Sequence, residues 1–148
     1  MSKDIISSDQ QKLLLRRLKT QGITNTSVLD VMSNMPRHLF IEPALKNRAY
    51  DDDALPIGFN QTISSPYIVA KMTQLLIEED NMGKLLEIGT GCGYQTAILS
   101  RLASRVYSIE RHKKLVDIAK DRLENLNISN VTILLQDGFL GYAPQAPF

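Results

Sequence analysis

The sequence predicts an α/β fold with a short parallel sheet, and three observations lead to this prediction. The stretch Lys84–Gln95 reads K-L-L-E-I-G-T-G-C-G-Y-Q, in which a short apolar strand runs into a glycine loop. A helical pattern begins after Tyr94, so the loop lies between a strand and a helix. Two further apolar runs, Arg105–Glu110 and Val131–Leu135, alternate with helical segments and predict two more strands. In open α/β sheets, a nucleotide-like ligand binds where such strands end.

The composition is that of an ordinary soluble domain. A length of 148 residues fits one domain, with 43% hydrophobic and 22% charged residues. The net charge of +1 gives no bulk electrostatic reason to expect nucleic acid or a membrane surface as a partner. The N-terminus lacks the apolar core of a signal peptide, and the single cysteine, Cys92, allows no internal disulfide. We therefore expect a cytoplasmic protein in which Cys92 is a structural residue of the glycine loop.

The first third of the chain predicts a helical hairpin. Ser8 or Asp9 is suited to cap a first helix that ends at Gly22. A second helix is expected from about residue 26 to Pro36. A short helical pattern follows at Ala44–Ala49. These helices are expected to pack against a larger unit.

The middle of the chain combines a charge run, a polar segment and a helix. Asp51–Asp53 is interpreted as a solvated turn, because no histidine or further acidic spacing supports a metal site. Gly58–Pro66 is polar and turn-like, with side chains suited to line a site. Ser64 or Ser65 is expected to cap a helix that begins near Pro66. Its apolar residues recur at helical spacing and predict a core-facing stripe of Ile68, Val69, Met72, Leu75 and Leu76. Residues 78–83 are expected to link this helix to the central strand.

Two nucleotide chemistries compete for the glycine loop. A dinucleotide fingerprint places glycine or alanine five positions after the first glycine, but this chain has Tyr94 there. The pattern is instead acidic-x-Gly-x-Gly-x-Gly, beginning at Glu87. S-adenosylmethionine carries a sulfonium and an amino-acid head and no phosphates, so nearby acidic residues suit it better. The loop therefore favours S-adenosylmethionine over a nicotinamide cofactor.

Polar residues at the ends of the next two strands support this interpretation. The second strand ends in Glu110, which is placed to accept bonds from two ribose hydroxyls. The third strand is followed by Gln136-Asp137-Gly138, where an adenine would be held. The alternative is that these turns need Gly and Asp for geometry alone.

The last predicted helix spans residues 112–125. Leu115, Ile118, Ala119 and Leu123 are expected to face inward, with His112 in solvent at the helix start. His38 is expected to be a half-buried loop residue.

Eight segments spread over most of the chain form a recognisable set of motifs. They are M-P-R-H-L-F (Met35–Phe40), R-A-Y-D-D (Arg48–Asp52), L-P-I-G (Leu55–Gly58), Q-T-I-S-S-P-Y-I-V-A (Gln61–Ala70), L-E-I-G-T-G-C-G-Y-Q (Leu86–Gln95), V-Y-S-I-E-R (Val106–Arg111), D-G (Asp137–Gly138) and A-P-F (Ala146–Phe148). With these segments the chain resembles a known family, the protein-L-isoaspartate O-methyltransferases. The glycine motif alone indicates only a class I methyltransferase, whereas Leu55–Gly58 together with Gln61–Pro66 narrows the resemblance to this family.

The resemblance implies a Rossmann-like class I methyltransferase sheet with an N-terminal helical subdomain, divided at residues 1–78 and 79–148. It implies methyl transfer from S-adenosylmethionine to the free carboxylate of L-isoaspartyl residues in damaged proteins. The methyl ester would then begin repair through a succinimide. The implied partners are isoaspartyl-containing proteins and peptides, with no nucleic acid, membrane or metal.

The resemblance also implies roles for individual residues. Ser64 is the expected catalytic residue, with Asp52 and Ser65 on the substrate side. The residues expected to bind the cofactor are Gln61, Thr62, Ile63, Glu87, Gly89, Thr90, Gly91, Gly93, Glu110, Arg111, Asp137 and Gly138.

One departure from the family concerns the C-terminus. In the family, the A-P-F segment leads into a fourth strand that pairs with the central one, whereas this sequence ends at Phe148. We therefore expect Lys84–Ile88 to have an open edge that favours self-association, and the substrate cleft to lack one wall. An inactive cofactor-binding fragment is the main alternative function, and a nicotinamide-dependent oxidoreductase is a weaker one.

Overall fold

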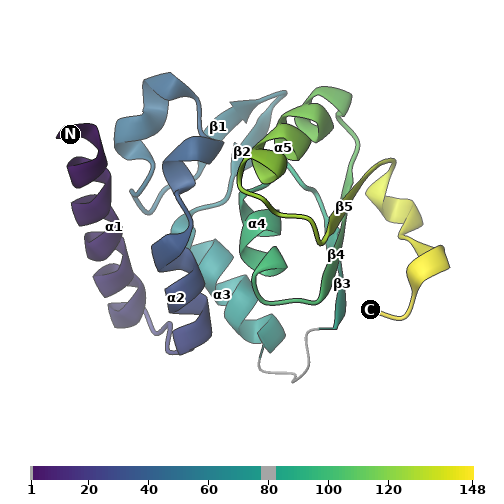
Figure 1. Ribbon diagram of the computed structural model, residues 1–148, viewed down its shortest axis with the longest axis horizontal. Coiled ribbons are helices and arrows are strands. Elements are labelled where there is room, and N and C mark those ends of the chain that lie inside the picture. The colour runs from purple at the N-terminus through teal and green to yellow at the C-terminus, as the bar shows by residue number, and fades with distance from the viewer. Residues whose placement is uncertain (1, 78–82) are drawn as a thin grey trace.

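The computed structural model describes residues 2–77 and 83–148. Helices α1 (Ser2–Thr20) and α2 (Thr26–Asn34) lie at one end of the molecule (Figure 1). Next come α3 (Pro66–Ile77), α4 (Tyr94–Ser100) and α5 (Lys113–Asn125). These three helices stand between the N-terminal helices and a sheet, and the C-terminal segment lies beyond the sheet (Figure 1).

The sheet has the predicted strands in a parallel arrangement. Its strands β3 (Lys84–Ile88), β4 (Arg105–Glu110) and β5 (Val131–Leu135) are ordered β3-β4-β5. Ile88 pairs with Ile109 and Glu110 with Leu135, so the three carboxyl ends meet at one edge. Within the described residues β3 pairs with β4 alone.

The helices that follow β3 and β4 bury one face of the sheet. Three of the four residues predicted to point inward from α5 are buried, namely Leu115, Ala119 and Leu123. The fourth, Ile118, is 38% exposed, so its predicted inward position is wrong. The largest buried cluster includes Leu14 of α1 and Ile133 of β5, so one core connects the helical part with the sheet.

The N-terminal helices form where predicted, but with different starts. Helix α1 begins at Ser2, so Ser8 and Asp9 lie inside it and the predicted cap is wrong. Helix α2 begins as predicted, and its cap is Asn25, whose side chain accepts a bond from the Val28 amide. Two 3₁₀ helices follow, η1 (Arg37–Phe40) and η2 (Pro43–Arg48), the second close to the predicted short helix.

A β-hairpin replaces most of the polar loop predicted over residues 58–66. Strand β1 (Leu55–Gly58) pairs antiparallel with β2 (Gln61–Ile63). Phe59 and Asn60 form the tip with φ of 55° and 54°, the left-handed pair that a two-residue hairpin turn requires. The strands are short and include Pro56, so the alternation typical of a strand was hidden in the sequence.

Helix α3 begins at Pro66 as predicted, but its apolar stripe does not face the core. Of the five residues in the stripe only Val69 is buried. Ile68, Met72, Leu75 and Leu76 are between 44% and 53% exposed. The helix instead buries Val69 with Ala70, Thr73 and Gln74, and the Gln74 side chain accepts bonds from the Thr24 and Asn25 amides. The polar joint to α2 therefore sets the orientation of the helix.

The C-terminal segment packs against the sheet through Tyr107 of β4. It contains η3 (Gly138–Leu140) and η4 (Ala143–Gln145). The Tyr107 hydroxyl donates to Gln145 Oε1 at 3.0 Å, and its ring lies 5.4 Å from the Tyr142 ring and 5.9 Å from the Phe148 ring.

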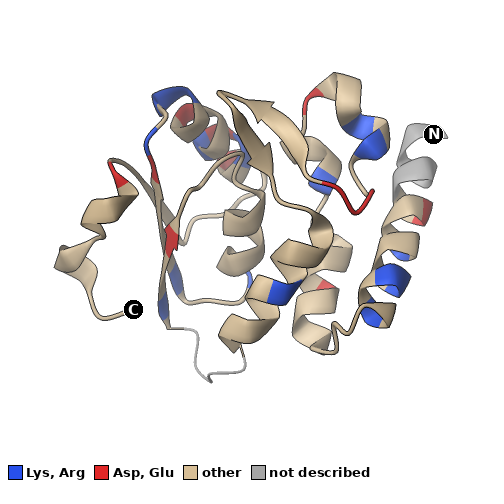
Figure 2. Cartoon of the chain, turned by 180° about the vertical axis from the view of Figure 1, so that it is seen from behind, with Lys and Arg blue, Asp and Glu red and all other residues tan. Residues whose placement is uncertain are grey.

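The predicted domain division at residues 78 and 79, and the linker at 78–83, fall almost entirely outside the described residues. Lys and Arg positions are interspersed with Asp and Glu positions along most elements, apart from one acidic stretch in a loop (Figure 2). No helix in residues 2–77 or 83–148 has the length and apolar character needed to cross a membrane.

Candidate active site

The glycine loop between β3 and α4 is tied to the end of β4. The Gly89 and Thr90 amides both donate to the Ile109 carbonyl, at 2.8 and 3.2 Å. Gly93 has φ of 88°, and a Cβ there would lie 3.2 Å from the Ala119 Cβ of α5. Glycine at this position therefore allows both the left-handed turn and the close approach of α5.

The Glu110 carboxylate holds the glycine loop through backbone hydrogen bonds. It is 6% exposed and accepts three backbone bonds of 2.9 Å, from the amides of Gly91, Arg111 and His112. A carboxylate offers about four acceptor positions, so about one remains for a ligand. Glu110 thus lies at the predicted place, but binding two ribose hydroxyls requires it to share or exchange a backbone bond.

Glu87 lies beneath the glycine loop, on the side that faces α4. Its Oε1 accepts bonds from Thr96 Oγ1 at 2.8 Å and from Ser108 Oγ at 3.1 Å. The Ser108 hydroxyl in turn bonds to the Thr90 hydroxyl of the loop. Burial raises the pKa of Glu87 to about 7, against the opposing effect of the Thr96 and Ser108 hydrogen bonds. Its Oε2 is buried and has no hydrogen-bond partner among the described residues.

The third strand end is held against the first. Asp137 Oδ1 accepts a bond from the Phe139 amide at 2.9 Å and so caps η3. A Cβ on Gly138 would lie only 2.4 Å from Ile88 Cγ2, so this contact between strand ends requires glycine. Gly138 therefore lies directly against the end of β3, and the adenine site expected here stays a prediction.

The structure brings the Gln61–Ser64 segment to the glycine loop. A cavity of about 60 Å³ is lined by Thr62, Ile63 and Ser64 on one side and by Gly89, Thr90 and Gly91 on the other. Ser64 is exposed, and it lies between β2 and α3. Gln61 is not part of this lining, and its Nε2 donates to the Phe59 carbonyl at 3.4 Å.

The two residues predicted on the substrate side hold helix α3 instead of lining that cavity. Asp52 Oδ1 accepts a bond from the Tyr67 amide at 3.1 Å, and Oδ2 accepts one from Gln21 Nε2 at 2.8 Å. Ser65 Oγ accepts a bond from the Ile68 amide at 3.4 Å.

The histidines differ in how well they match expectation. His38 is half-buried as expected, although in η1 rather than in a loop, and its Nδ1 is 2.8 Å from the Tyr50 hydroxyl. His112 is half-buried rather than in solvent, because its ring stacks on Phe59 of the hairpin tip at 5.7 Å. Cys92 is buried in the loop, as expected for a structural residue, and burial raises the pKa of its thiol.

Three residues near the site were not predicted from the sequence. Arg37 and Tyr94 are fully buried beside the Ser64 segment, and Ser108 connects Glu87 with the loop. Only Ser108 gave a usable signal, as a polar residue inside an otherwise apolar strand.

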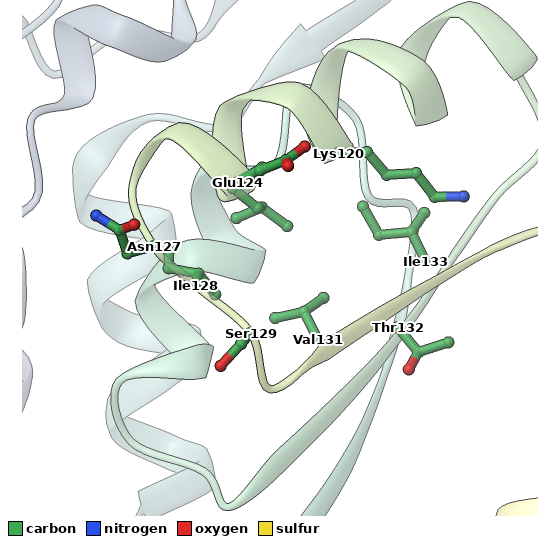
Figure 3. Close-up of a pocket in the computed structure, with 9 residues that line it drawn as sticks. Lys120, Glu124, Asn127, Ile128, Ser129, Val131, Thr132 and Ile133 are labelled. Atoms are coloured by element: carbon green, nitrogen blue, oxygen red, sulfur yellow. The ribbon is translucent and has the colours of Figure 1, made fainter.

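A much larger groove lies elsewhere among the described residues. It measures about 670 Å³ and runs between α5 and β5 (Figure 3). None of the predicted site residues lines it, and its walls combine Lys120, Glu124 and Thr132 with apolar side chains. Its size therefore does not identify the site, whereas the small cavity at the strand ends holds the convergent polar groups.

Comparison with protein families gives one match that covers nearly the whole chain. The family model described as protein-L-isoaspartate(D-aspartate) O-methyltransferase matches residues 9–148. Relatives named protein-L-isoaspartate O-methyltransferase from Pseudomonas fluorescens and Pseudomonas syringae are 51% and 52% identical over 142 residues. These alignments cover 96% of this chain and 67% of each relative, so the chain spans about two thirds of their length.

Solved structures of similar proteins agree. A protein-L-isoaspartate O-methyltransferase matches with a TM-score of 0.79 and 28% identity, over 93% of this chain and 45% of that one. A putative enzyme of the same name from Plasmodium falciparum, in complex with S-adenosyl-L-homocysteine, matches with a TM-score of 0.72 and 26% identity. That match covers 85% of this chain and 62% of the other.

Proposed function

This chain belongs to the protein-L-isoaspartate(D-aspartate) O-methyltransferase family, and we propose that it transfers a methyl group from S-adenosylmethionine to the free carboxylate of L-isoaspartyl residues. The observation that carries the proposal is the shared cavity between the glycine loop and the Gln61–Ser64 segment, which we call the acceptor-side segment. Ser64 of this segment faces the glycine loop across the cavity. Group transfer is fast when the donor and the acceptor are held close together in the right orientation.

The residues at the strand ends suit S-adenosylmethionine. Glu110 keeps about one acceptor position free for a ribose hydroxyl. Gly138 lies in close contact with Ile88, and the side chain of Ile88 is 56% exposed and offers apolar contact to an adenine. Glu87 and the loop residues Gly89, Thr90, Gly91 and Gly93 would surround the methionine part from below, and Arg111, Asp137 and Thr62 would form the rim. When bound, the cofactor supplies an electrophilic methyl group on a sulfonium.

Orientation supplies most of the catalysis in this proposal. An isoaspartyl carboxylate has a reference pKa near ~4 and is ionised at neutral pH, so no strong general base is needed. Ser64 donates a hydrogen bond that aims the carboxylate at the methyl group. Holding reacting groups in place contributes roughly 7–11 kcal/mol to such reactions. Asp52 and Ser65 act indirectly, because they fix the start of α3 next to Ser64.

The methyl ester explains how transfer leads to repair. A neutral methyl ester is attacked far more readily than an ionised carboxylate, which would have to expel oxide. The neighbouring backbone nitrogen therefore attacks the ester carbonyl, methoxide leaves with the amide proton as methanol, and a succinimide forms. Hydrolysis of the succinimide returns a fraction of the damaged residues to normal aspartate. The partners are therefore isoaspartyl-containing proteins and peptides in the cytoplasm.

A second candidate function is cofactor binding without methyl transfer. The described residues include all three strand ends of the cofactor side, whereas β3 has no partner on its other edge among them. This edge of β3 and the exposed apolar residues of α3 support self-association of the chain. A nicotinamide-dependent oxidoreductase is not supported, because the fingerprint position holds the fully buried Tyr94 and the family match is to methyltransferases.

Two substitutions separate cofactor binding from transfer. Glu110→Ala should weaken binding of S-adenosylhomocysteine by roughly 1–3 kcal/mol in calorimetry, since a charged acceptor is lost. Ser64→Ala should keep that affinity and lower the rate constant for methylation of an isoaspartyl peptide. Unchanged affinity in the first variant would remove Glu110 from the cofactor site, and an unchanged rate in the second would remove the role of Ser64.

A further inference from the structure

Arg37 is a buried cation that the proposed chemistry does not use. It belongs to η1, has no exposed surface, and makes no ion pair with an acidic side chain of the described residues. Burial lowers the pKa of the Arg37 guanidinium, with partial compensation from Tyr94 and Cys92. An unpaired buried charge destabilises a fold unless fixed dipoles compensate it. The partners that compensate Arg37 therefore indicate what it holds in place.

Those partners come from three segments that are distant in the sequence. Arg37 Nε donates to the Ala49 carbonyl at 2.7 Å, and Nη2 donates to the Ser64 carbonyl at 2.8 Å. The guanidinium carbon lies 4.8 Å from the centre of the Tyr94 ring, in a cation–π contact. Tyr94 is the first residue of α4, directly after the glycine loop. The Arg37 side chain thus connects the acceptor-side segment with α4, the helix that begins directly after the glycine loop.

Both of the functional contacts of Arg37 lead to the same small cavity. Ser64 and Tyr94 line it together with Thr90 and Gly91, and Arg37 lies behind that wall. Ser64 follows the last residue of β2 and precedes α3, so neither the strand ladder nor the helix fixes its carbonyl. The bond from Arg37 supplies a fixed attachment at this point.

We propose that Arg37 is a positioning residue. Its guanidinium clamps Ser64 against Tyr94 and so sets the spacing between the acceptor-side segment and the glycine loop. The planar fork of arginine bonds two carbonyls while its face stacks on a ring, which lysine cannot reproduce. The consequence for methyl transfer depends on the proposed function of Ser64. The clamp itself does not.

The test uses two variants of Arg37 and a matched control. Arg37→Met keeps an apolar stem without donors or charge, and Arg37→Lys keeps the charge but cannot hold both carbonyls. Leu14→Ala in α1 creates a cavity in the same core away from Ser64 and serves as a control for general destabilisation. All four proteins are compared in amide hydrogen exchange of a peptide spanning residues 59–65, in binding of S-adenosylhomocysteine, and in methylation of an isoaspartyl peptide.

The clamp predicts that exchange in this peptide is about tenfold faster in Arg37→Met than in Leu14→Ala, as expected for loss of a charge-assisted hydrogen bond. Arg37→Lys should fall between the two, and it provides the comparison if Arg37→Met does not fold. Affinity for S-adenosylhomocysteine should stay near the wild-type value, while kcat for the peptide falls more than KM changes.

Equal exchange in the Arg37 variants and the Leu14→Ala control would overturn the clamp. Faster exchange with unchanged kcat and KM would overturn its positioning role. A wild-type chain that does not methylate the peptide counts against the proposed function, and the exchange measurement still decides the clamp.

Discussion

Glu87 is an ionisable residue beneath the glycine loop whose pKa is raised by burial. Burial raises its pKa from 4.5 to about 7, so the folded protein holds this proton more tightly than the unfolded chain. The Glu87 contribution to the free energy of unfolding therefore falls as pH rises from about 4.5 to about 7, and the loss is complete above that range.

Glu87→Gln should remove this pH dependence, because the amide oxygen still accepts the Thr96 and Ser108 bonds and carries no charge. Relative to wild type, the variant should gain on the order of 3 kcal/mol in unfolding free energy between pH 4.5 and pH 8. Urea denaturation at the two pH values measures the difference. If the difference in unfolding free energy between Glu87→Gln and wild type is the same at both pH values, Glu87 ionises freely in the folded protein.

Gly138 gives a steric prediction at the third strand end. Gly138→Ala should destabilise the protein by about 1–3 kcal/mol, because the new Cβ overlaps Ile88 Cγ2. Adding Ile88→Ala should recover most of that loss, and a double-mutant cycle by thermal denaturation measures the coupling. Strictly additive effects would mean that the strand ends do not touch in solution.

At the scale of single residues, the sequence predicted where the acidic and glycine residues lie, but not which groups they hydrogen-bond to. Glu110 lies at the predicted strand end, yet nothing in the sequence indicated that three backbone amides already occupy its carboxylate. Arg37 was missed because a buried arginine has the same sequence signal as a solvated one. The pattern of residue types gives positions along an element, whereas hydrogen-bond partners depend on tertiary contacts.

Among the elements, helix α3 shows where periodicity misleads. The spacing of Ile68, Met72, Leu75 and Leu76 identifies one face of a helix, but it does not say which neighbours are present to cover that face. The described elements pack on the other face, through Val69, Ala70 and the polar Gln74. The start of α3 was predictable, since Pro66 suits a first helical position.

The exposed face of α3 predicts concentration-dependent self-association. Replacing Met72 and Leu75 by lysine should reduce association and change the unfolding free energy by only about 0.5 kcal/mol, as is usual for exposed sites. Val69→Lys, on the buried face of the same helix, should instead unfold the protein. Sedimentation equilibrium over a range of concentrations measures the effect. A wild-type chain that stays monomeric at every concentration would contradict the prediction.

For the whole molecule, the sequence was sufficient to predict that β3, β4 and β5 form a parallel sheet, because a strand, a loop and a helix recur in order. The hairpin of β1 and β2 was not predicted, since two strands of four and three residues carry too little alternation. This hairpin carries Gln61–Ile63 and leads into Ser64, so the position of the acceptor-side segment depends on the element that the sequence did not predict. Within the described residues, its tip is held by the contact between Phe59 and His112.

We propose that this fold places an isoaspartyl carboxylate next to the methyl group of S-adenosylmethionine. The most direct test incubates the chain with methyl-labelled S-adenosylmethionine and either an isoaspartyl peptide or the same peptide with normal aspartate. Label should enter the isoaspartyl peptide alone, and Ser64→Ala should reduce it. Equal labelling of both peptides, or labelling of neither by a chain that binds the cofactor, would contradict the account.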